Sequence, residues 1–143
     1  TQRMFNKINK KNMREIKFRG MDANGIMRYG RLSQDKENST VYYKEYSQRI
    51  CWDNSNIPVS NESLGQYTGL KDKNGKEIYE RDIVTHNIYT KESGREGHSK
   101  PKLIIWDKEK AGFEFDYGGY KNGLFYSEYE IIGNIYENPE LLK

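Results

Sequence analysis

Few side chains in this 143-residue chain are of types and spacings that could do chemistry. Three carboxylates gather at Glu77, Glu80 and Asp82. A pair of carboxylates can act as general acid and general base. Between two predicted strands, however, such residues are more often edge and corner residues, and we expect Asp82 to cap a backbone amide. The sequence therefore predicts a protein that is not an enzyme.

Metal binding finds little support in the sequence. The chain has two histidines, His86 and His98, and neither stands at the spacing of a metal site. Neither Cys-x-x-Cys nor His-Glu-x-x-His occurs. We therefore expect no metal and no cofactor.

A polar run over residues 91–100 contains no apolar side chain and predicts a loop that is either mobile or functional. It resembles a phosphate-binding loop only superficially, because it lacks the Gly-Lys-Ser/Thr order and the strand–loop–helix context. Its basic residues could still contact an anion. They are Arg95, His98 and Lys100.

Tyrosines interspersed with Arg and Lys form a second group of candidate binding residues. Tyrosine can stack on nucleic-acid bases or line a protein interface. The candidates are Tyr42, Tyr43, Tyr117 and Tyr120, with Arg81 in the charged corner before Asp82. The alternative is that half of the tyrosines simply build the core.

The composition suits one small folded domain. Hydrophobic residues make up 34% and charged residues 31%, a balance that leans toward disorder. Twelve Tyr, five Phe and two Trp argue for a core, since each aromatic side chain buries about 150–250 Å². Because this core is modest, we expect a homo-oligomer in which a partner subunit completes the burial.

Three further features of the composition concern the N-terminal segment, the cellular compartment and membrane insertion. The net charge is +3, and much of the excess lies before residue 20, so residues 1–12 are predicted to be a flexible basic extension. The single cysteine, Cys51, cannot form an internal disulfide and fits a reducing cytoplasm. No run of 18 apolar residues exists, so no membrane span is expected.

The stretch from Leu64 to Thr85 organises the predicted fold as strand, turn, strand, corner and strand. Asp72-Lys73-Asn74-Gly75 is its turn signal, because Asn-Gly tolerates the positive φ angles of tight hairpins. About five strands between residues 76 and 136 would be enough to close a small barrel. Residues 53–61 are predicted to be a loop because they hold Asn, Ser and Pro58.

Three blocks of the sequence carry a family resemblance. They are MREIKFR at residues 13–19, QYTGLKDKNGKEIYE at residues 66–80 followed by DIV at 82–84, and IIGNIYENPELL at residues 131–142. On these blocks the chain resembles the YopX family, small proteins of phages and prophages in Gram-positive bacteria. It departs from the family at Arg81, where Gly is typical, and a non-Gly residue argues against a left-handed backbone there.

The resemblance implies a mainly β protein that self-associates and has no known enzyme activity. The expected fold is an SH3-like small barrel in residues 64–143 with an N-terminal β-hairpin subdomain in residues 13–63. The expected role is that of an accessory protein in the cytoplasm of the bacterial host.

Two functions are compatible with the sequence. The first is non-enzymatic binding of a host protein or a small anionic ligand, in host takeover or counter-defence. The alternative is a nucleic-acid-binding small barrel, favoured by the basic N-terminal arm and the basic residues between 95 and 102. No membrane partner is expected.

Overall fold

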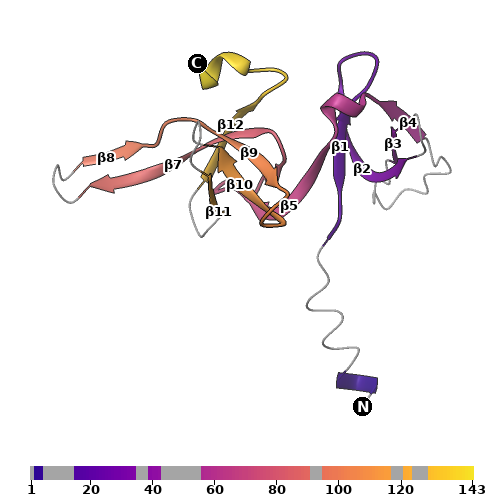
Figure 1. The fold of residues 1–143 in the computed structure, drawn as a ribbon, viewed down its shortest axis with the longest axis horizontal. Coiled ribbons are helices and arrows are strands. Elements are labelled where there is room, and N and C mark those ends of the chain that lie inside the picture. The colour runs from indigo at the N-terminus through magenta and orange to yellow at the C-terminus, as the bar shows by residue number, and fades with distance from the viewer. Residues whose placement is uncertain are drawn as a thin grey trace.

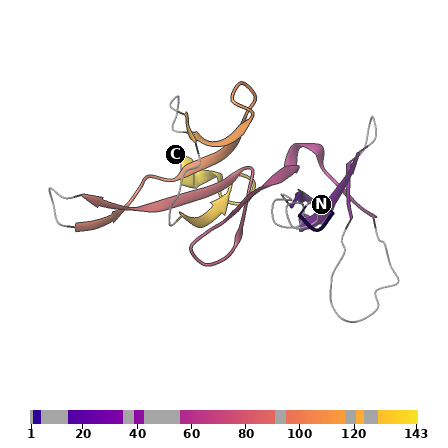
Figure 2. The same ribbon diagram turned by 90° about the horizontal axis from the view of Figure 1, so that it is seen from below.

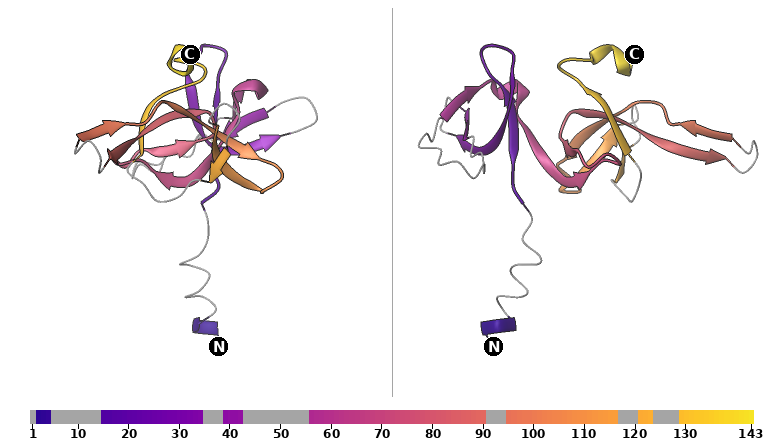
Figure 3. Two further views of the ribbon diagram at one scale, coloured as in Figure 1. Left: turned by 60° about the vertical axis from the view of Figure 1, so that its left-hand side comes forward. Right: turned by 180° about the vertical axis from the view of Figure 1, so that it is seen from behind.

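The computed structural model describes residues 2–4, 15–34, 39–42, 56–90, 95–116, 121–123 and 129–143. Within these ranges the chain forms two antiparallel sheets and two short 3-10 turns. The sheets form two lobes that lie side by side, and β5 (Gly65–Lys71) runs from one to the other (Figures 1 and 3). The same arrangement is visible from below in Figure 2.

The N-terminal sheet has the strand order β4-β3-β2-β1-β5-β6. Its 3-10 turn η1 (Asn61–Ser63) begins where the side chain of Ser60 accepts a hydrogen bond from the amide of Ser63. The other strands are β1 (Phe18–Met21), β2 (Met27–Gln34), β3 (Ser39–Tyr42), β4 (Asn56–Val59) and β6 (Glu77–Tyr79).

The C-terminal sheet has the strand order β11-β10-β9-β7-β12, and β8 pairs with the outer part of β7. The turn η2 (Pro139–Leu142) follows the last strand and starts with proline, whose missing amide would have no partner at that position. The strands are β7 (Asp82–Thr90), β8 (Arg95–His98), β9 (Lys102–Asp107), β10 (Gly112–Asp116), β11 (Lys121–Gly123) and β12 (Tyr129–Asn134).

The predicted central hairpin is formed by β5 and β6 around the Asp72–Gly75 turn. One carboxylate oxygen of Asp72 accepts hydrogen bonds from the amides of Asn74 and Lys76, and Gly75 has a φ of 81°. Its other oxygen accepts from the amide of Ile131 in β12 at 3.2 Å. The turn therefore also docks the hairpin onto the C-terminal sheet.

The prediction of a mainly β fold is confirmed, whereas the SH3-like barrel is not. Every strand pair among the described residues is antiparallel, and both sheets stay open. After β5, the chain adds β6 to the N-terminal sheet, and β7 then starts the other sheet between β9 and β12. The predicted division at residues 63 and 64 stays a prediction.

Two segments predicted to be loops contain strands. The loop predicted at residues 53–61 includes β4, in which Pro58 is tolerated because β4 is the edge of its sheet. The polar loop predicted at residues 91–100 includes β8, which pairs along β7 from Asn87 to Thr90. Backbone pairing to a neighbouring strand overrides the weak strand propensity of these polar residues.

The hydrophobic core lies in the C-terminal lobe. Its buried members are Ile78, Val84, Ile104, Phe115 and Tyr129. Ile78 comes from β6 of the N-terminal sheet, whereas the other four come from the C-terminal sheet. At about 1.5–3 kcal/mol for each fully buried large apolar side chain, this contact fixes β6 against the second lobe.

Candidate functional site: a cleft between the two sheets

A cleft of about 250 Å³ lies where the N-terminal sheet faces β12 of the C-terminal sheet. Residues from β1, β2, β6, β7 and β12 meet there because the central hairpin brings the two sheets together. Its polar and charged lining consists of Arg19, Tyr29, Lys76, Glu77, Asp82, Asn134 and Glu137, and Ile131, Ile132 and Gly133 complete the wall.

A buried ion pair between Arg19 and Asp82 forms the centre of this lining. Nη1 of Arg19 lies 2.7 Å from Oδ1 of Asp82, and the two side chains are 5% and 3% exposed. Nη2 of Arg19 donates to the carbonyl oxygen of Glu80 at 3.0 Å. Burial raises the pKa of Asp82, although the Arg19 charge opposes this effect.

Asp82 also accepts a hydrogen bond from the backbone amide of Tyr79, at 2.8 Å from Oδ2. The prediction that Asp82 caps a backbone amide is therefore confirmed. Both of its oxygens are occupied by protein donors, so the residue holds the corner between β6 and β7 in place.

Glu77 is held by two donors at the side of the cleft. Lys17 donates to one of its oxygens at 2.6 Å and the hydroxyl of Tyr79 to the other at 2.8 Å. Burial acts to raise the pKa of Glu77, but these hydrogen bonds outweigh it and hold the pKa below its ordinary value. Burial, together with the same carboxylate, raises the pKa of the Tyr79 hydroxyl.

Three aromatic rings pack around the side chain of Arg19 or against one another beside it. The guanidinium of Arg19 lies 5.2 Å from the ring centroid of Tyr79, within the range of a cation–π contact. The ring of Tyr29 meets that of Tyr79 edge-on at 5.3 Å, and Tyr67 approaches it at 5.5 Å. The position of Arg19 is therefore fixed by a ring, a carboxylate and a carbonyl.

Comparison with known proteins identifies the family. The sequence profile described as YopX protein matches residues 3–143. The chain belongs to the YopX family. It is also similar to the crystal structure of protein EF1440 from Enterococcus faecalis, with 24% identity, a TM-score of 0.52, and 92% of this chain and 100% of that chain covered. No curated protein matches the sequence.

Arg81 has a left-handed backbone, with a φ of 67°, in this YopX chain. The expectation drawn from its non-Gly side chain was wrong. Its backbone is held on both sides by β9 and by the residue after β12, because its amide donates to the carbonyl oxygen of Ile104 at 2.7 Å and its carbonyl accepts from the amide of Ile135 at 3.0 Å. These bonds offset the cost of about 1–2 kcal/mol of this conformation.

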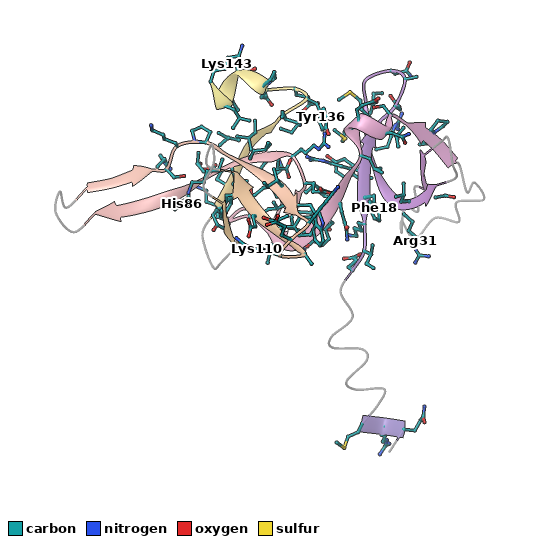
Figure 4. The ribbon with its side chains drawn as sticks, viewed as in Figure 1. Phe18, Arg31, His86, Lys110, Tyr136 and Lys143 are labelled. Carbon is teal, nitrogen blue, oxygen red and sulfur yellow. The ribbon has the colours of Figure 1, made fainter. Side chains whose placement is uncertain are left out.

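The side chain of Arg81 connects the two lobes. Its Nη1 donates to the carbonyl oxygen of Glu62 in η1, and its guanidinium lies 5.9 Å from the ring centroid of Tyr136. The hydroxyl of Tyr136 donates to that same carbonyl at 2.7 Å. Tyr136 points across the space between the lobes (Figure 4). Arg81 was predicted as a binding residue, and the structure assigns it this contact.

The basic residues predicted to contact an anion lie in β8 and just after it, outside the cleft lining. Arg95 begins β8 and pairs with Thr90, and His98 ends β8 and pairs with Asn87. His98 and Lys100 are exposed, with Ser99 buried between them. The structure therefore places His98 and Lys100 on one side of this segment.

Of the four predicted tyrosines, the structure describes Tyr42, which is not among the residues that line the cleft. Tyr42 ends β3, where it pairs with Arg31 and Asn56. Tyr43, Tyr117 and Tyr120 lie outside the residues that the structure describes, as does Cys51.

The cleft residues Arg19, Tyr29, Lys76, Asn134 and Glu137 were absent from the predicted binding set. Arg19 ends a family block in sequence, where it counts only as one of many basic residues. Arg19 ends the family block at residues 13–19, and Asp82 begins the block at residues 82–84. Their opposite charges were the one feature of the sequence that could have indicated this ion pair. The described residues contain no group of three metal-ligating side chains, and no described helix could span a membrane.

Proposed function

We propose that this protein is a non-enzymatic accessory protein of a phage or prophage that self-associates and binds a host protein or a small anionic ligand. It would act in the cytoplasm of the bacterial host, in host takeover or counter-defence. The family membership supports the phage context. Consistent with a binding role, the cleft carboxylates Glu77 and Asp82 are both occupied by structural donors.

One observation carries the self-association. The outer part of β7 and all of β8 form a two-stranded ribbon, Asn87–Thr90 with Arg95–His98, that extends away from the C-terminal lobe (Figure 1). Among the described strands, β8 pairs with β7 alone. A two-stranded ribbon is marginally stable in water by itself, and an edge strand such as β8, which pairs with no other described strand, invites another chain. A second copy would stabilise the ribbon and cover its edges.

Native mass spectrometry on protein purified from host cells tests the proposal, since it reports the subunit count and any retained partner together. We expect a discrete oligomer. Gly97→Pro should reduce the subunit count, because proline removes an amide from β8. Gly97→Ala is the matched control, because nothing lies within 4 Å of the added methyl group. A wild-type monomer with no retained mass would overturn the proposal.

Nucleic-acid binding is the second candidate function. The exposed side chains of His98 and Lys100 on one side of the chain favour it. Binding of DNA or RNA across a salt series tests it, because true phosphate contacts give a steep loss of affinity with rising salt. An absence of binding even at low salt would remove this candidate.

A further inference from the structure

Three hydrogen-bond donors in the cleft lining have no partner among the described residues. Nε of Arg19 is buried and donates no hydrogen bond. The ammonium of Lys76 and the hydroxyl of Tyr29 make no hydrogen bond or ion pair with another described side chain, and both residues line the cleft but are exposed to solvent, Tyr29 at 44%. A buried donor left unpaired costs about 1–3 kcal/mol, so Arg19 in particular calls for an acceptor.

The acceptors of the lining are, in contrast, already engaged. Asp82 is bonded to Arg19 and to the amide of Tyr79, and Glu77 is bonded to Lys17 and Tyr79. Glu137 accepts a hydrogen bond of 2.7 Å from Nδ2 of Asn134. The unpaired donors of the cleft could therefore be satisfied by a ligand that carries several acceptor oxygens, such as an oxyanion.

The size of the cleft suits a small anion, which must rely on the donors of the lining rather than on its net charge. The lining holds three carboxylates and two cations, and Lys17, which lies outside it, pairs with both Glu77 and Glu15. The cleft volume of about 250 Å³ is smaller than the roughly 300–1,000 Å³ of pockets for drug-sized ligands. A nucleotide is thereby disfavoured, whereas a phosphate ion or a short carboxylate fits.

We propose that the cleft between the two sheets binds a small oxyanion, a phosphate or a carboxylate, through Arg19, Lys76 and Tyr29. This inference rests on the small-ligand part of the proposed function and gives it a site. Lys76 is exposed and would meet the ligand at the entrance. Arg19 is 4% exposed and its two Nη atoms are held by Asp82 and Glu80, so the ligand oxygen would have to reach the unpaired Nε from the cleft. A charge-assisted hydrogen bond would then replace an unpaired donor.

Calorimetric titration at low ionic strength tests the site with two separate probes, inorganic phosphate and succinate. We expect saturable binding of at least one, and comparison of the two identifies the class of oxyanion. Lys76→Ala should weaken binding about tenfold, since a charge-assisted hydrogen bond contributes about 1.5–3 kcal/mol. Tyr29→Phe keeps the ring on Tyr79 and should weaken binding about threefold.

Two further variants test whether anion affinity depends on charge, and whether that charge must lie in the cleft lining. Glu137→Gln removes a negative charge from the lining and should tighten binding. Lys71→Ala removes the same charge as Lys76→Ala from the same hairpin, but Lys71 lies outside the lining and beside Glu77, so it should weaken binding less than Lys76→Ala does. Absence of saturable binding, or equal losses in Lys71→Ala and Lys76→Ala, would overturn the site.

Native mass spectrometry of the same samples separates this inference from self-association. An intact oligomer without anion binding contradicts the cleft site and leaves the ribbon proposal standing. A monomer that still binds phosphate through Lys76 contradicts self-association and supports the cleft site.

Discussion

Arg19 and Asp82 form a buried ion pair, with 2.7 Å between Nη1 and Oδ1, that joins the first strand of one sheet to the first strand of the other. Strand pairing does not make this connection, because β1 pairs with β2 and β5. Two residues adjoin the pair: Gly65 is the strand partner of Arg19, and the carbonyl oxygen of Glu80 accepts a hydrogen bond from the Arg19 guanidinium. The pair thus fixes the geometry of the cleft.

Arg19→Met should destabilise the protein by about 3–5 kcal/mol, because it leaves the Asp82 carboxylate buried without its partner. Adding Asp82→Asn should recover part of this loss, since asparagine removes the unpaired charge and can still accept from the Tyr79 amide. Urea unfolding at about pH 7 measures both effects. Arg28→Met is the control, because its pair with Asp22 is more exposed and should cost less than about 1 kcal/mol. Losses that simply add in the double variant would contradict the coupling.

Glu77 should make stability depend on pH. Its pKa in the folded protein lies below the ordinary value of 4.5, so its stabilising effect is present above 4.5 and is lost as pH falls through the folded-state pKa. Glu77→Gln should therefore cost about 1 kcal/mol near pH 7 and progressively less in more acidic buffer. Urea unfolding over a pH series measures this difference, and a cost that stays constant into acid would exclude the assigned cause.

Gly65 should tolerate no side chain. A Cβ atom there would lie 2.9 Å from the carbonyl oxygen of Glu80, which is the acceptor for Arg19. Gly65→Ala should therefore cost about 1–3 kcal/mol, because a backbone atom must move. Thermal unfolding compares it with Gly97→Ala, which has open space around the new methyl group. Equal stability of the two variants would show that the close approach at Gly65 is wrong.

Arg81 separates backbone strain from side-chain contacts. Both Arg81→Gly and Arg81→Ala lose the contacts to Glu62 and Tyr136, but only glycine relieves the left-handed backbone. Arg81→Gly should therefore be more stable than Arg81→Ala by about 1 kcal/mol. Chemical denaturation of the two variants measures this, and a more stable alanine variant would mean that residue 81 has an ordinary φ in solution.

Local signals in the sequence predicted much of the fold. The Asp72–Gly75 turn and the strands around it follow from the preferences of a few adjacent residues. The strands β4 and β8 were missed because they are polar and depend on pairing with β3 and β7. A closed barrel was expected from the family resemblance and from the number of strands, and strand number does not determine which strands become neighbours.

The cleft could not be predicted from the sequence for a similar reason. Asp82 was recognised as a capping residue because its partner, the amide of Tyr79, is close in the chain. Arg19 looked like one more cation of a basic arm, since nothing local indicates that β1 lies against the start of β7. In the sequence, Lys76 is recognisable only as a residue next to the predicted turn. Its place in the cleft depends on β12, which contributes the other part of the lining.

The most direct measurement of oxyanion binding is an NMR titration that follows the Nε–H signals of arginine side chains as phosphate or succinate is added. The signal of Arg19 should shift saturably, with the dissociation constant found by calorimetry, and in Lys76→Ala the same shift should require about tenfold more anion. The signal of Arg28, whose Nε already donates to Asp22 at 2.8 Å, should stay unchanged. An Arg19 signal that does not respond to either anion, or that moves no more than that of Arg28, would contradict the proposed site.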